Sequence, residues 1–485
     1  MAPSIIIVPP FLKSVSGPLL GPAMLVGSAR SAGFRVSVHD LNAAYIGDRL
    51  DLGSFTPGPF IGDHDRPSGP LRSLQRAFAA TCNRVLPERD AGLGECEPLT
   101  LTYGHGEVQA AAHALAADPE VGGWIERQLA GAPRPPAVVG VSVLYSGQVL
   151  WALAASIVAK RLWPETLVVW GGSHVTALRD VIAAKPEYGF AVDRFVVGHA
   201  ERTFVDILRA TERNSQLPAE ALVAGAGRWV SAKDDPGVVP DFLGSRVAWA
   251  RPTLPAQASR GCAYGRCSFC TYPAIEGAVR LAPDAHLVGV LDAAIARGAA
   301  ISLKDSLVIP TRLEHVAGLI GGRVRWSACT KLHARIDGAF ARTLAASGCA
   351  TIEVGLETLT GDGQLLFDKR QTPDLFIRVT EALAAAGIAV VVNYMTGLPG
   401  VEHADEQTWL AWVQTATARL GALGKVEHNG FQLERLSPMG EAPGRYGLRV
   451  TRTWPWASVM AWEPKAQVAG EDVRIRQVPT PTVEV

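Results

Sequence analysis

The sequence predicts an α/β protein with an N-terminal Rossmann-like doubly wound parallel sheet, a partial (βα)6 TIM-like barrel and a small C-terminal extension. A length of 485 residues suggests two or three domains. Short apolar runs alternate with helical patterns in both halves, and an Asp/Pro/Gly-rich stretch at 233–245 separates the halves. With 48% hydrophobic and 19% charged residues, the chain can bury a large core.

This alternation sets the expected domain bounds. We expect residues 1–232 to form the Rossmann-like domain, interrupted by an insertion at 43–135 where Pro/Gly clusters break the pattern. Residues 233–250 are the expected linker, 251–440 the barrel and 441–485 the C-terminal extension. The insertion is typical of a cap or a binding loop, and the alternative is a peripheral elaboration.

The N-terminal half contains continuous apolar strands of the kind found in parallel sheets covered by helices on both faces. Strands are expected at 4–10, 34–42, 137–146, 166–176 and 193–201, and helices at 18–32, 148–161, 175–184 and 201–212, with two more near 70–85 and 106–130 in the insertion. Ligands of such sheets bind beyond the carboxyl ends of the strands. Those ends are small or polar here: LYSGQ, GGSHVT and GHAE.

The second half alternates again between apolar strands and helical patterns. Strands are expected at 256–261, 299–305, 324–331, 349–357, 388–397 and 427–434. Six βα units in this space fit a partial barrel, whose chemistry takes place at the strand ends. The Trp-rich stretch 451–465 could floor a pocket or belong to a packed C-terminal subdomain, and the final dozen residues resemble a frayed tail.

Composition excludes several classes of function. Lys+Arg and Asp+Glu both number 46, which leaves no electrostatic footprint for nucleic acid or an anionic membrane. No window approaches the apolar length of a membrane span, and the N-terminal apolar run is a buried strand and not a signal peptide. We therefore expect a soluble, cytoplasmic protein. An odd count of seven cysteines, four of them scattered, indicates reduced thiols.

The remaining three cysteines form a cluster with the spacing Cys262-x4-Cys267-x2-Cys270. Three thiolates can hold three irons of a cubane cluster and leave the fourth iron open to another ligand. A closed zinc site would need a fourth ligand, and the nearest histidines lack the usual spacing. A zinc site and inert cysteines are the alternatives.

The stretch CAYGRCSFC resembles the cysteine motif of the radical SAM superfamily, which has three cysteines spaced x3 and x2 and an aromatic residue before the last. One extra residue separates the first two cysteines here. The resemblance implies that Cys262, Cys267 and Cys270 are catalytic metal ligands of a 4Fe-4S cluster. S-adenosylmethionine would occupy the open iron, and Phe269 would lie near its adenine.

Three further segments resemble that family in the same order. ISLKDS resembles the second-strand segment and ends in Asp305, GCATIEVGLETLT resembles the fourth strand, and VNYMTGLPG resembles the fifth-strand glycine motif. Glycine lets the backbone approach a ligand closely. The cofactor-binding residues that we infer from these segments and the last expected strand are Glu353, Gly355, Glu357, Asn393, Gly397, Leu398 and Gln432. For Glu353 and Glu357 the alternative is a salt bridge inside the barrel mouth.

The N-terminal half resembles the cobalamin-binding domain that precedes many radical SAM modules, on the segments GVSVLYSGQ, VVWGGSHVTAL and FVVGHAERTF. The residues that would line the corrin and its nucleotide tail are Ser142, Ser146, Gly171, Gly172, Ser173, His174, Thr176, Gly198 and Glu201. The Asp-x-His-x-x-Gly signature is absent, so cobalamin would bind without a protein imidazole on cobalt. The alternatives are a domain without cofactor or one that recruits substrate, and His174 alone resembles a satisfied loop histidine.

Together the two resemblances imply a cobalamin-dependent radical SAM enzyme, and specifically a C-methyltransferase in natural-product or peptide modification. An external electron donor would drive cleavage of S-adenosylmethionine to a 5′-deoxyadenosyl radical, which removes hydrogen from a substrate carbon that then takes a methyl group from methylcobalamin. Lys331, His333 and Arg335 could contact substrate or the methionyl carboxylate, or form a solvated strand end. A cyclase or rearrangement enzyme and a non-enzymatic sensor are the alternatives. The substrate could be a small molecule or a peptide.

Overall fold

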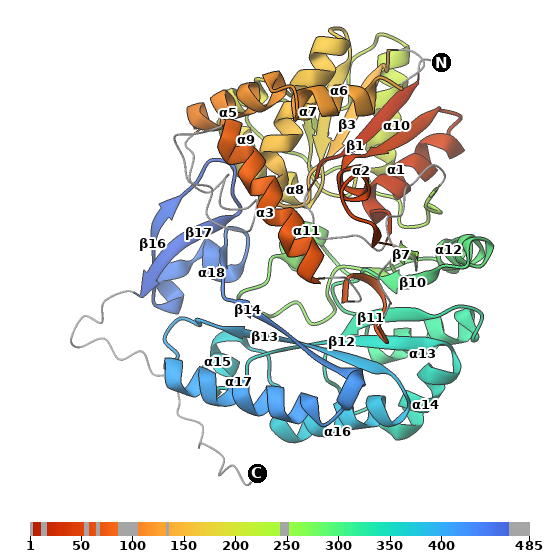
Figure 1. Ribbon diagram of the computed structural model, residues 1–485, viewed down its shortest axis with the longest axis vertical. Helices are drawn as coiled ribbons and strands as arrows, with labels where there is room; N and C mark the ends of the chain where they lie inside the picture. Colours follow the sequence, from red (N-terminus) through yellow and green to blue (C-terminus); the bar gives the residue numbers. More distant parts are fainter. Residues whose placement is uncertain are drawn as a thin grey trace.

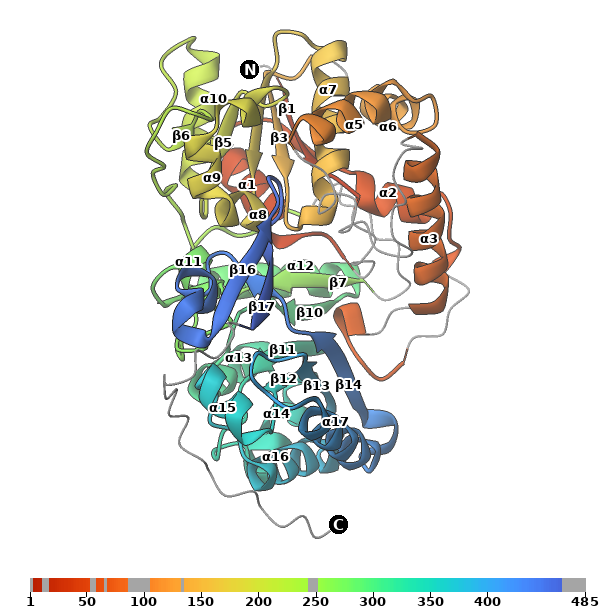
Figure 2. The ribbon, with the colours of Figure 1, turned by 90° about the vertical axis from the view of Figure 1, so that its left-hand side faces the viewer.

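The described part of the fold has two six-stranded sheets, a three-stranded sheet that lies beside both, and a two-stranded ribbon (Figures 1 and 2). The computed structural model describes residues 3–10, 17–52, 58–64, 68–85, 105–131, 135–242 and 252–464. Residues 243–250 of the expected linker and the C-terminal tail 465–485 lie outside the described residues. Within those ranges no helix is both long enough and apolar enough to cross a membrane.

The N-terminal sheet has the order β2-β1-β3-β4-β5-β6, with β1 to β5 parallel and β6 antiparallel to β5. Its strands are β1 Ser4–Val8, β2 Val36–Asp40, β3 Val138–Ser142, β4 Leu167–Gly171, β5 Arg194–Val196 and β6 Ala221–Leu222. The doubly wound class is thus as predicted, in the flavodoxin-like variant of the strand order. In that variant the order reverses between β1 and β3, and ligands bind beyond the strand ends at this switch point.

Helices cover both faces of this sheet (Figure 2). They are α1 Leu20–Ser31, α7 Val149–Leu162, α8 Ser173–Ala177, α9 Arg179–Ala184 and α10 Glu201–Glu212, with the 3-10 turns η3 Ser146–Gln148 and η4 Pro186–Gly189. Helices α1 and α10 contact each other on one face, while α7 contacts helices of the insertion on the other.

The insertion helices pack into the N-terminal core. They are α2 Leu41–Gly47, η2 Gly62–His64, α3 Ser68–Val85, α5 His105–Ala117 and α6 Gly122–Leu129. Tyr45 of α2, Phe78 of α3 and Trp124 of α6 meet Trp151 of α7, and the rings of Phe78 and Trp151 stack with centroids 4.6 Å apart. Because these rings are buried, the insertion is part of the core and not a peripheral elaboration.

The second sheet is entirely parallel and has the order β14-β13-β12-β11-β10-β7. Its strands are β7 Thr253–Ala256, β10 Ala300–Leu303, β11 Trp326–Thr330, β12 Cys349–Glu357, β13 Ala389–Thr396 and β14 Gly424–Gly430. The connecting helices are α12 Asp284–Arg297, α13 Pro310–Ile320, α14 Gly338–Ala346, α15 Gly361–Phe367, α16 Pro373–Ala385 and α17 His403–Ala418, followed by η5 Gly421–Leu423. Each strand lies next to its predecessor, as expected for six consecutive βα units.

Two strands of this half lie at positions other than those predicted. The segment 256–261 was expected to be the first barrel strand, but β7 ends at Ala256, and β8 Ser259–Arg260 pairs with β9 Arg280–Leu281 in a separate ribbon. The Asp305 carboxylate accepts hydrogen bonds from the backbone N–H groups of residues 258 and 259, which diverts the chain out of the sheet. At the other edge, β15 Leu433–Glu434 leaves β14 and joins the C-terminal sheet.

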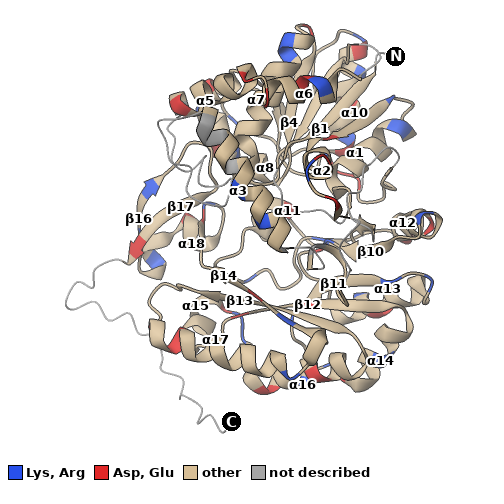
Figure 3. Cartoon of the chain, viewed as in Figure 1, with Lys and Arg blue, Asp and Glu red and all other residues tan. Residues whose placement is uncertain are grey.

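The C-terminal sheet has the order β15-β17-β16 and returns the chain to the N-terminal half. It comprises β16 Leu448–Thr453 and β17 Val459–Pro464, preceded by α18 Pro438–Glu441 and η6 Pro443–Tyr446. Between β16 and β17, Trp456 is 1% exposed and contacts Tyr188 and Trp170 of the N-terminal core. This tryptophan is packed in the N-terminal core. Basic and acidic residues are interspersed over the outer helices (Figure 3).

Candidate active site

The three clustered cysteines line a single cavity of about 600 Å³ at the carboxyl ends of β10, β11, β12 and β13. Their loop turns at Gly265, whose φ of 58° is left-handed and whose N–H lies 3.5 Å from the Cys262 Sγ. A glycine adopts this conformation without strain. The longer step from Cys262 to Cys267 is therefore taken up by one left-handed turn.

The cysteine loop is tied to its surroundings at two points. Before it, buried Asp305 accepts hydrogen bonds from Ala258 N at 2.9 Å and Ser259 Oγ at 2.7 Å, and burial raises the pKa of Asp305 to about 6. Within it, the Tyr264 hydroxyl donates to the carbonyl of Asp368. These contacts hold the thiols at the cavity wall before any metal is bound.

Burial determines the charge state of two of these thiols. It raises the pKa of Cys267 and raises that of Cys270 to about 12, so both are protonated at neutral pH in the free protein. Iron binding would displace these protons, since the thiolate is the ligand. Among the described residues, no three Cys, His, Asp or Glu side chains converge as they would on one metal ion. A cubane cluster does not require this, because each thiolate binds a different iron.

Two lysines that line the cavity lie beside the cysteine loop. Lys369 Nζ lies 3.2 Å from Glu357 Oε1, and Lys331 Nζ lies 3.4 Å from the centroid of the Tyr264 ring. Burial and the neighbouring Lys369 lower the pKa of Lys331 to about 8. Glu357 has a φ of 68°, and a Cβ at Gly355 would lie 2.7 Å from its carboxylate. Gly355 thus leaves room for the Glu357–Lys369 ion pair.

The far end of the cavity is closed by the insertion. Glu353 Oε1 accepts a hydrogen bond from Asn393 Nδ2 at 2.5 Å, and its Oε2 lies 3.1 Å from His64 Nε2. The other ring nitrogen of His64 is 3.6 Å from Glu427 Oε1. Burial acts to lower the pKa of His64, but the two carboxylates raise it; His64 in turn outweighs burial and lowers the pKa of Glu353.

Backbone contacts hold this part of the insertion against the second sheet. Ile61 N donates to Thr351 Oγ1 at 3.0 Å, and Lys425 donates to the His64 carbonyl at 3.2 Å. Ile61 and His64 therefore line the cavity together with residues almost 300 positions later. Neither residue belongs to a motif, and the only signal for them in the sequence is the insertion itself.

Of the residues predicted to bind S-adenosylmethionine, Phe269, Glu353, Gly355, Glu357 and Asn393 line this cavity, together with Lys331. His333 and Arg335 are exposed and lie outside it, with Arg335 paired to Glu314 at 2.8 Å. This is the solvated strand end named as the alternative for those two side chains.

The predicted residues of the last two strands lie elsewhere. Gly397 N and Leu398 N donate to the carboxylate of buried Glu406 at 2.9 and 2.7 Å, and the Leu398 side chain is buried in a hydrophobic cluster. Gln432 is exposed. None of these three lines the cavity described above.

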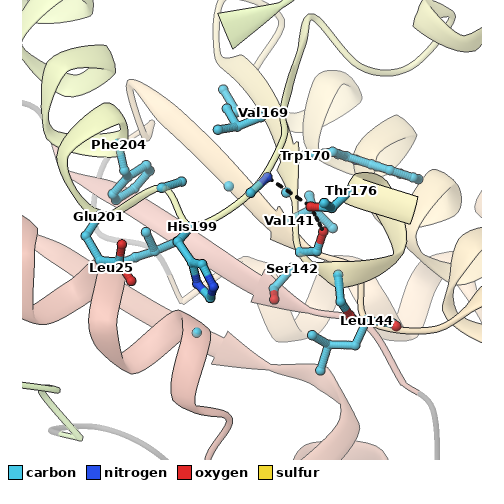
Figure 4. Close-up of a pocket in the computed structure, with 18 of the residues that line it drawn as sticks. Leu25, Val141, Ser142, Leu144, Val169, Trp170, Thr176, His199, Glu201 and Phe204 are labelled. Atoms are coloured by element: carbon cyan, nitrogen blue, oxygen red, sulfur yellow. Dashed lines mark hydrogen bonds between the residues drawn. The ribbon is translucent and has the colours of Figure 1, made fainter. Parts of the chain in front are cut away.

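A second cavity of about 240 Å³ lies at the carboxyl ends of the N-terminal strands (Figure 4). Seven of the residues predicted there line it: Ser142, Gly171, Gly172, Ser173, Thr176, Gly198 and Glu201. Ser146 is buried outside it, in η3. His174 is also outside, with its Nε2 2.8 Å from the carbonyl of Trp456, and burial lowers its pKa to about 4. It is a satisfied structural histidine.

Hydrogen bonds join the loops of this second cavity into one floor. Thr176 Oγ1 accepts from Gly198 N and donates to the Gly172 carbonyl, both at 2.9 Å, and Ser173 Oγ donates to the Leu144 carbonyl at 3.0 Å. Gly172 has a φ of 113°, and a Cβ there would lie 2.3 Å from the Val143 carbonyl oxygen. This glycine is required by both conformation and space.

The two cavities adjoin. The short helix α11 Tyr272–Glu276, which follows the cysteine loop, contributes Tyr272, Ile275 and Glu276 to the N-terminal cavity. Leu144 and Tyr272 line both cavities. A ligand held on the N-terminal strand ends would thus face the thiol-lined cavity.

A buried ion pair connects the same two regions. Arg260, two residues before Cys262, places its Nη2 2.6 Å from Glu201 Oε1, and the side chains are 2% and 5% exposed. Glu201 begins α10, so the wall of one cavity is held to the strand that leads into the cysteine loop.

Comparison with known proteins identifies one domain and an overall fold. Residues 257–412 match the family model of the radical SAM superfamily. The radical S-adenosylmethionine methyltransferase TsrM from Kitasatospora setae, solved with cobalamin and a [4Fe-4S] cluster, is 16% identical, with a TM-score of 0.59 over 93% of this chain and 81% of TsrM. A search of curated protein sequences found no match.

A second similar structure is the cobalamin-dependent S-adenosylmethionine radical enzyme OxsB, solved with aqua-cobalamin and S-adenosylmethionine. It is 12% identical, with a TM-score of 0.60 over 95% of this chain and 64% of OxsB. This chain therefore matches somewhat less than two thirds of OxsB. At such identities the likeness shows a shared fold, from the N-terminal sheet through the radical SAM domain.

Proposed function

We propose that this chain, which carries a radical SAM domain at residues 257–412, is a cobalamin-dependent enzyme that methylates a carbon atom of its substrate. The observation that carries the proposal is the adjacency of the two cavities. One is lined by the three clustered cysteines and by Cys329, the other lies on the strand ends of a doubly wound sheet, and Leu144 and Tyr272 line both.

The residues present fit the groups that the proposal requires. Cys262, Cys267 and Cys270 form a donor set suited to iron and leave one iron of a 4Fe-4S cluster open. S-adenosylmethionine bound there and methylcobalamin in the neighbouring domain would supply a 5′-deoxyadenosyl radical and a methyl group. The protein then contributes orientation and exclusion of competing reactions.

Phe269 and Lys331, which line the same cavity as the thiols, would each bind a different part of S-adenosylmethionine. Phe269 packs against Phe367 with ring centroids 4.4 Å apart and presents an apolar surface for adenine. Lys331 has no carboxylate partner among the ion pairs of the described residues, and would hold an anionic group such as the methionyl carboxylate. The Glu357–Lys369 pair next to it is already internally neutralised.

The N-terminal cavity would take only part of a cobalamin, because about 240 Å³ is small for so large a cofactor. Its inner wall is apolar, with Ile6, Val169, Phe204 and Ile207, and would suit the planar base of the nucleotide tail. The corrin would then lie against the Gly171–Thr176 loop, facing α11 and the thiol-lined cavity.

The substrate would occupy the far end of the larger cavity, between Glu353, Asn393 and His64. TsrM has been solved with tryptophan as its substrate, and a small polar molecule of that kind is the substrate class we propose here. A precursor peptide is the alternative. An external donor would supply the electron.

The test is anaerobic reconstitution with iron, sulfide, cobalamin and S-adenosylmethionine, followed by reduction with dithionite. We expect bound cobalamin, an iron–sulfur absorption band and formation of deoxyadenosine. Cys267→Ala should abolish the last two, whereas Cys349→Ala, which removes a buried thiol outside the cavity, should retain them. Deoxyadenosine formation with a modified product of unchanged carbon count would refute methylation and favour a rearrangement.

A further inference from the structure

His199 lies on the loop between β5 and α10 and lines the N-terminal cavity. Figure 4 shows its ring directed away from this loop, into the space between Leu25 and Ser142. The sequence places His199 in the 198–201 segment expected to line the corrin, but without the context of an axial cobalt ligand and with no role of its own.

The Nε2 atom of His199 is buried and has no hydrogen-bond partner in the described part of the chain. Six other buried side-chain atoms share this property there, but none of them belongs to a residue that lines the N-terminal cavity. A buried polar atom without a partner is costly and therefore uncommon in folded proteins. At the wall of a cavity, a polar group of a bound ligand would supply the missing partner.

The imidazole is neutral at physiological pH. Burial and the nearby Arg260 guanidinium lower the pKa of His199 to about 4, against the opposing effect of Glu201 and Asp234. Glu201 is itself paired with Arg260, at 2.6 Å. His199 thus offers a neutral donor or acceptor, which suits an amide or a hydroxyl group better than an anion.

The strand order indicates which part of a ligand His199 would reach. The switch point of the sheet lies between β1 and β3, and a ligand is centred there. His199 follows β5, which is separated from β3 by β4. Its ring would therefore contact the periphery of a large planar ligand and not its centre.

We propose that His199 Nε2 forms a hydrogen bond with a peripheral amide or hydroxyl group of cobalamin bound in the N-terminal cavity, and does not coordinate the cobalt. This inference rests on the proposed function, because it takes cobalamin as the ligand. It assigns His199 as a cofactor-binding residue that anchors the edge of the macrocycle or its nucleotide tail.

The test is an equilibrium titration of the cobalamin-free protein with hydroxocobalamin, followed by absorbance. His199→Phe keeps a planar ring but removes the nitrogen, and should raise the Kd about tenfold. His199→Gln, whose amide can replace the hydrogen bond, should restore most of the affinity. His113→Phe, a change at an exposed histidine of α5, is the matched control and should leave the Kd unchanged.

Two results would overturn the inference alone. The first is wild-type protein that binds cobalamin while His199→Phe binds it equally well. The second is nitrogen splitting in the electron paramagnetic resonance spectrum of the Co(II) form that changes on ¹⁵N labelling of histidine. The latter would show an imidazole on cobalt. Failure of the wild-type protein to bind cobalamin at all would overturn the proposed function, and this inference with it.

Discussion

Breaking the buried ion pair between Arg260 and Glu201 should cost an unusually large amount of stability, and Glu201→Gln tests this. The substitution keeps the shape of the side chain and removes its charge. Arg260 would then hold a guanidinium, 2% exposed, without the carboxylate that lies 2.6 Å from it. An arginine cannot escape this by losing its proton.

The structure sets the size of the effect. Removing one partner of a buried pair costs about 3–5 kcal/mol, because the other charge stays desolvated. Asp234 Oδ2 lies 3.3 Å from Arg260 Nη1 and offers partial compensation, although Asp234 is 21% exposed. Gln257 Oε1 also accepts from Arg260 Nε, at 3.2 Å. We therefore expect the low end of that range, about 3 kcal/mol.

The assay is denaturant unfolding of the cofactor-free protein, with the change in free energy taken from the midpoint and slope. Asp206→Asn is the matched control, since it breaks the exposed Asp206–Arg209 pair on the same helix, at 3.2 Å. That change should cost about 0.5 kcal/mol or less, and added salt should reduce it further. If Glu201→Gln destabilises no more than the control, the buried pair does not hold the two halves together.

Two further predictions concern conformation and pH. Gly172→Ala places a Cβ against a backbone carbonyl at a φ of 113°, so it should weaken cobalamin binding and lower the stability of the protein. Gly318→Ala, in a helix with open space around the new Cβ, should be neutral or stabilising by about 0.5–1 kcal/mol. Equal unfolding midpoints for the two variants would contradict this prediction. Because the pKa of His64 is raised, its protonated form should stabilise the contact with Glu353 and Glu427 below about pH 6.5, and this stabilisation should be lost as pH rises through the raised value. The difference in unfolding free energy between wild type and His64→Gln should therefore shrink on going to alkaline pH, and a difference that grows would refute it.

Local sequence patterns predicted most of the fold. The strand 349–357 was predicted with the bounds that the structure has, because its sequence is a run of β-branched and apolar residues that ends with the acidic Glu357. The structure buries most of this run. Strand 253–256 was misplaced because its extent depends on Asp305, almost 50 residues later, which captures the backbone after it. No local pattern carries that information.

The same division holds for the two cavities. The cysteines and most of the Gly171–Thr176 loop, which line the two cavities, could be singled out from the sequence because they belong to short motifs. His64 and the pairing of Glu201 with Arg260 were not, since each joins segments far apart in the chain. At the glycine motif around residue 397 a short motif is present, but its contacts were not predicted. Its backbone N–H groups donate to Glu406, a nearby helix residue that the motif does not include.

The burial of Trp456 against the first sheet has a consequence for biosynthesis. Its indole is 1% exposed and belongs to the core of a half that otherwise ends near residue 232. At typical translation rates, the ribosome needs roughly 10–50 s to reach Trp456 after that half has emerged. During this interval the apolar surface around Tyr188 that Trp456 later covers would be exposed, and His174 would lack its carbonyl partner. The cobalamin domain we propose would therefore be completed last, after the iron–sulfur loop has been translated.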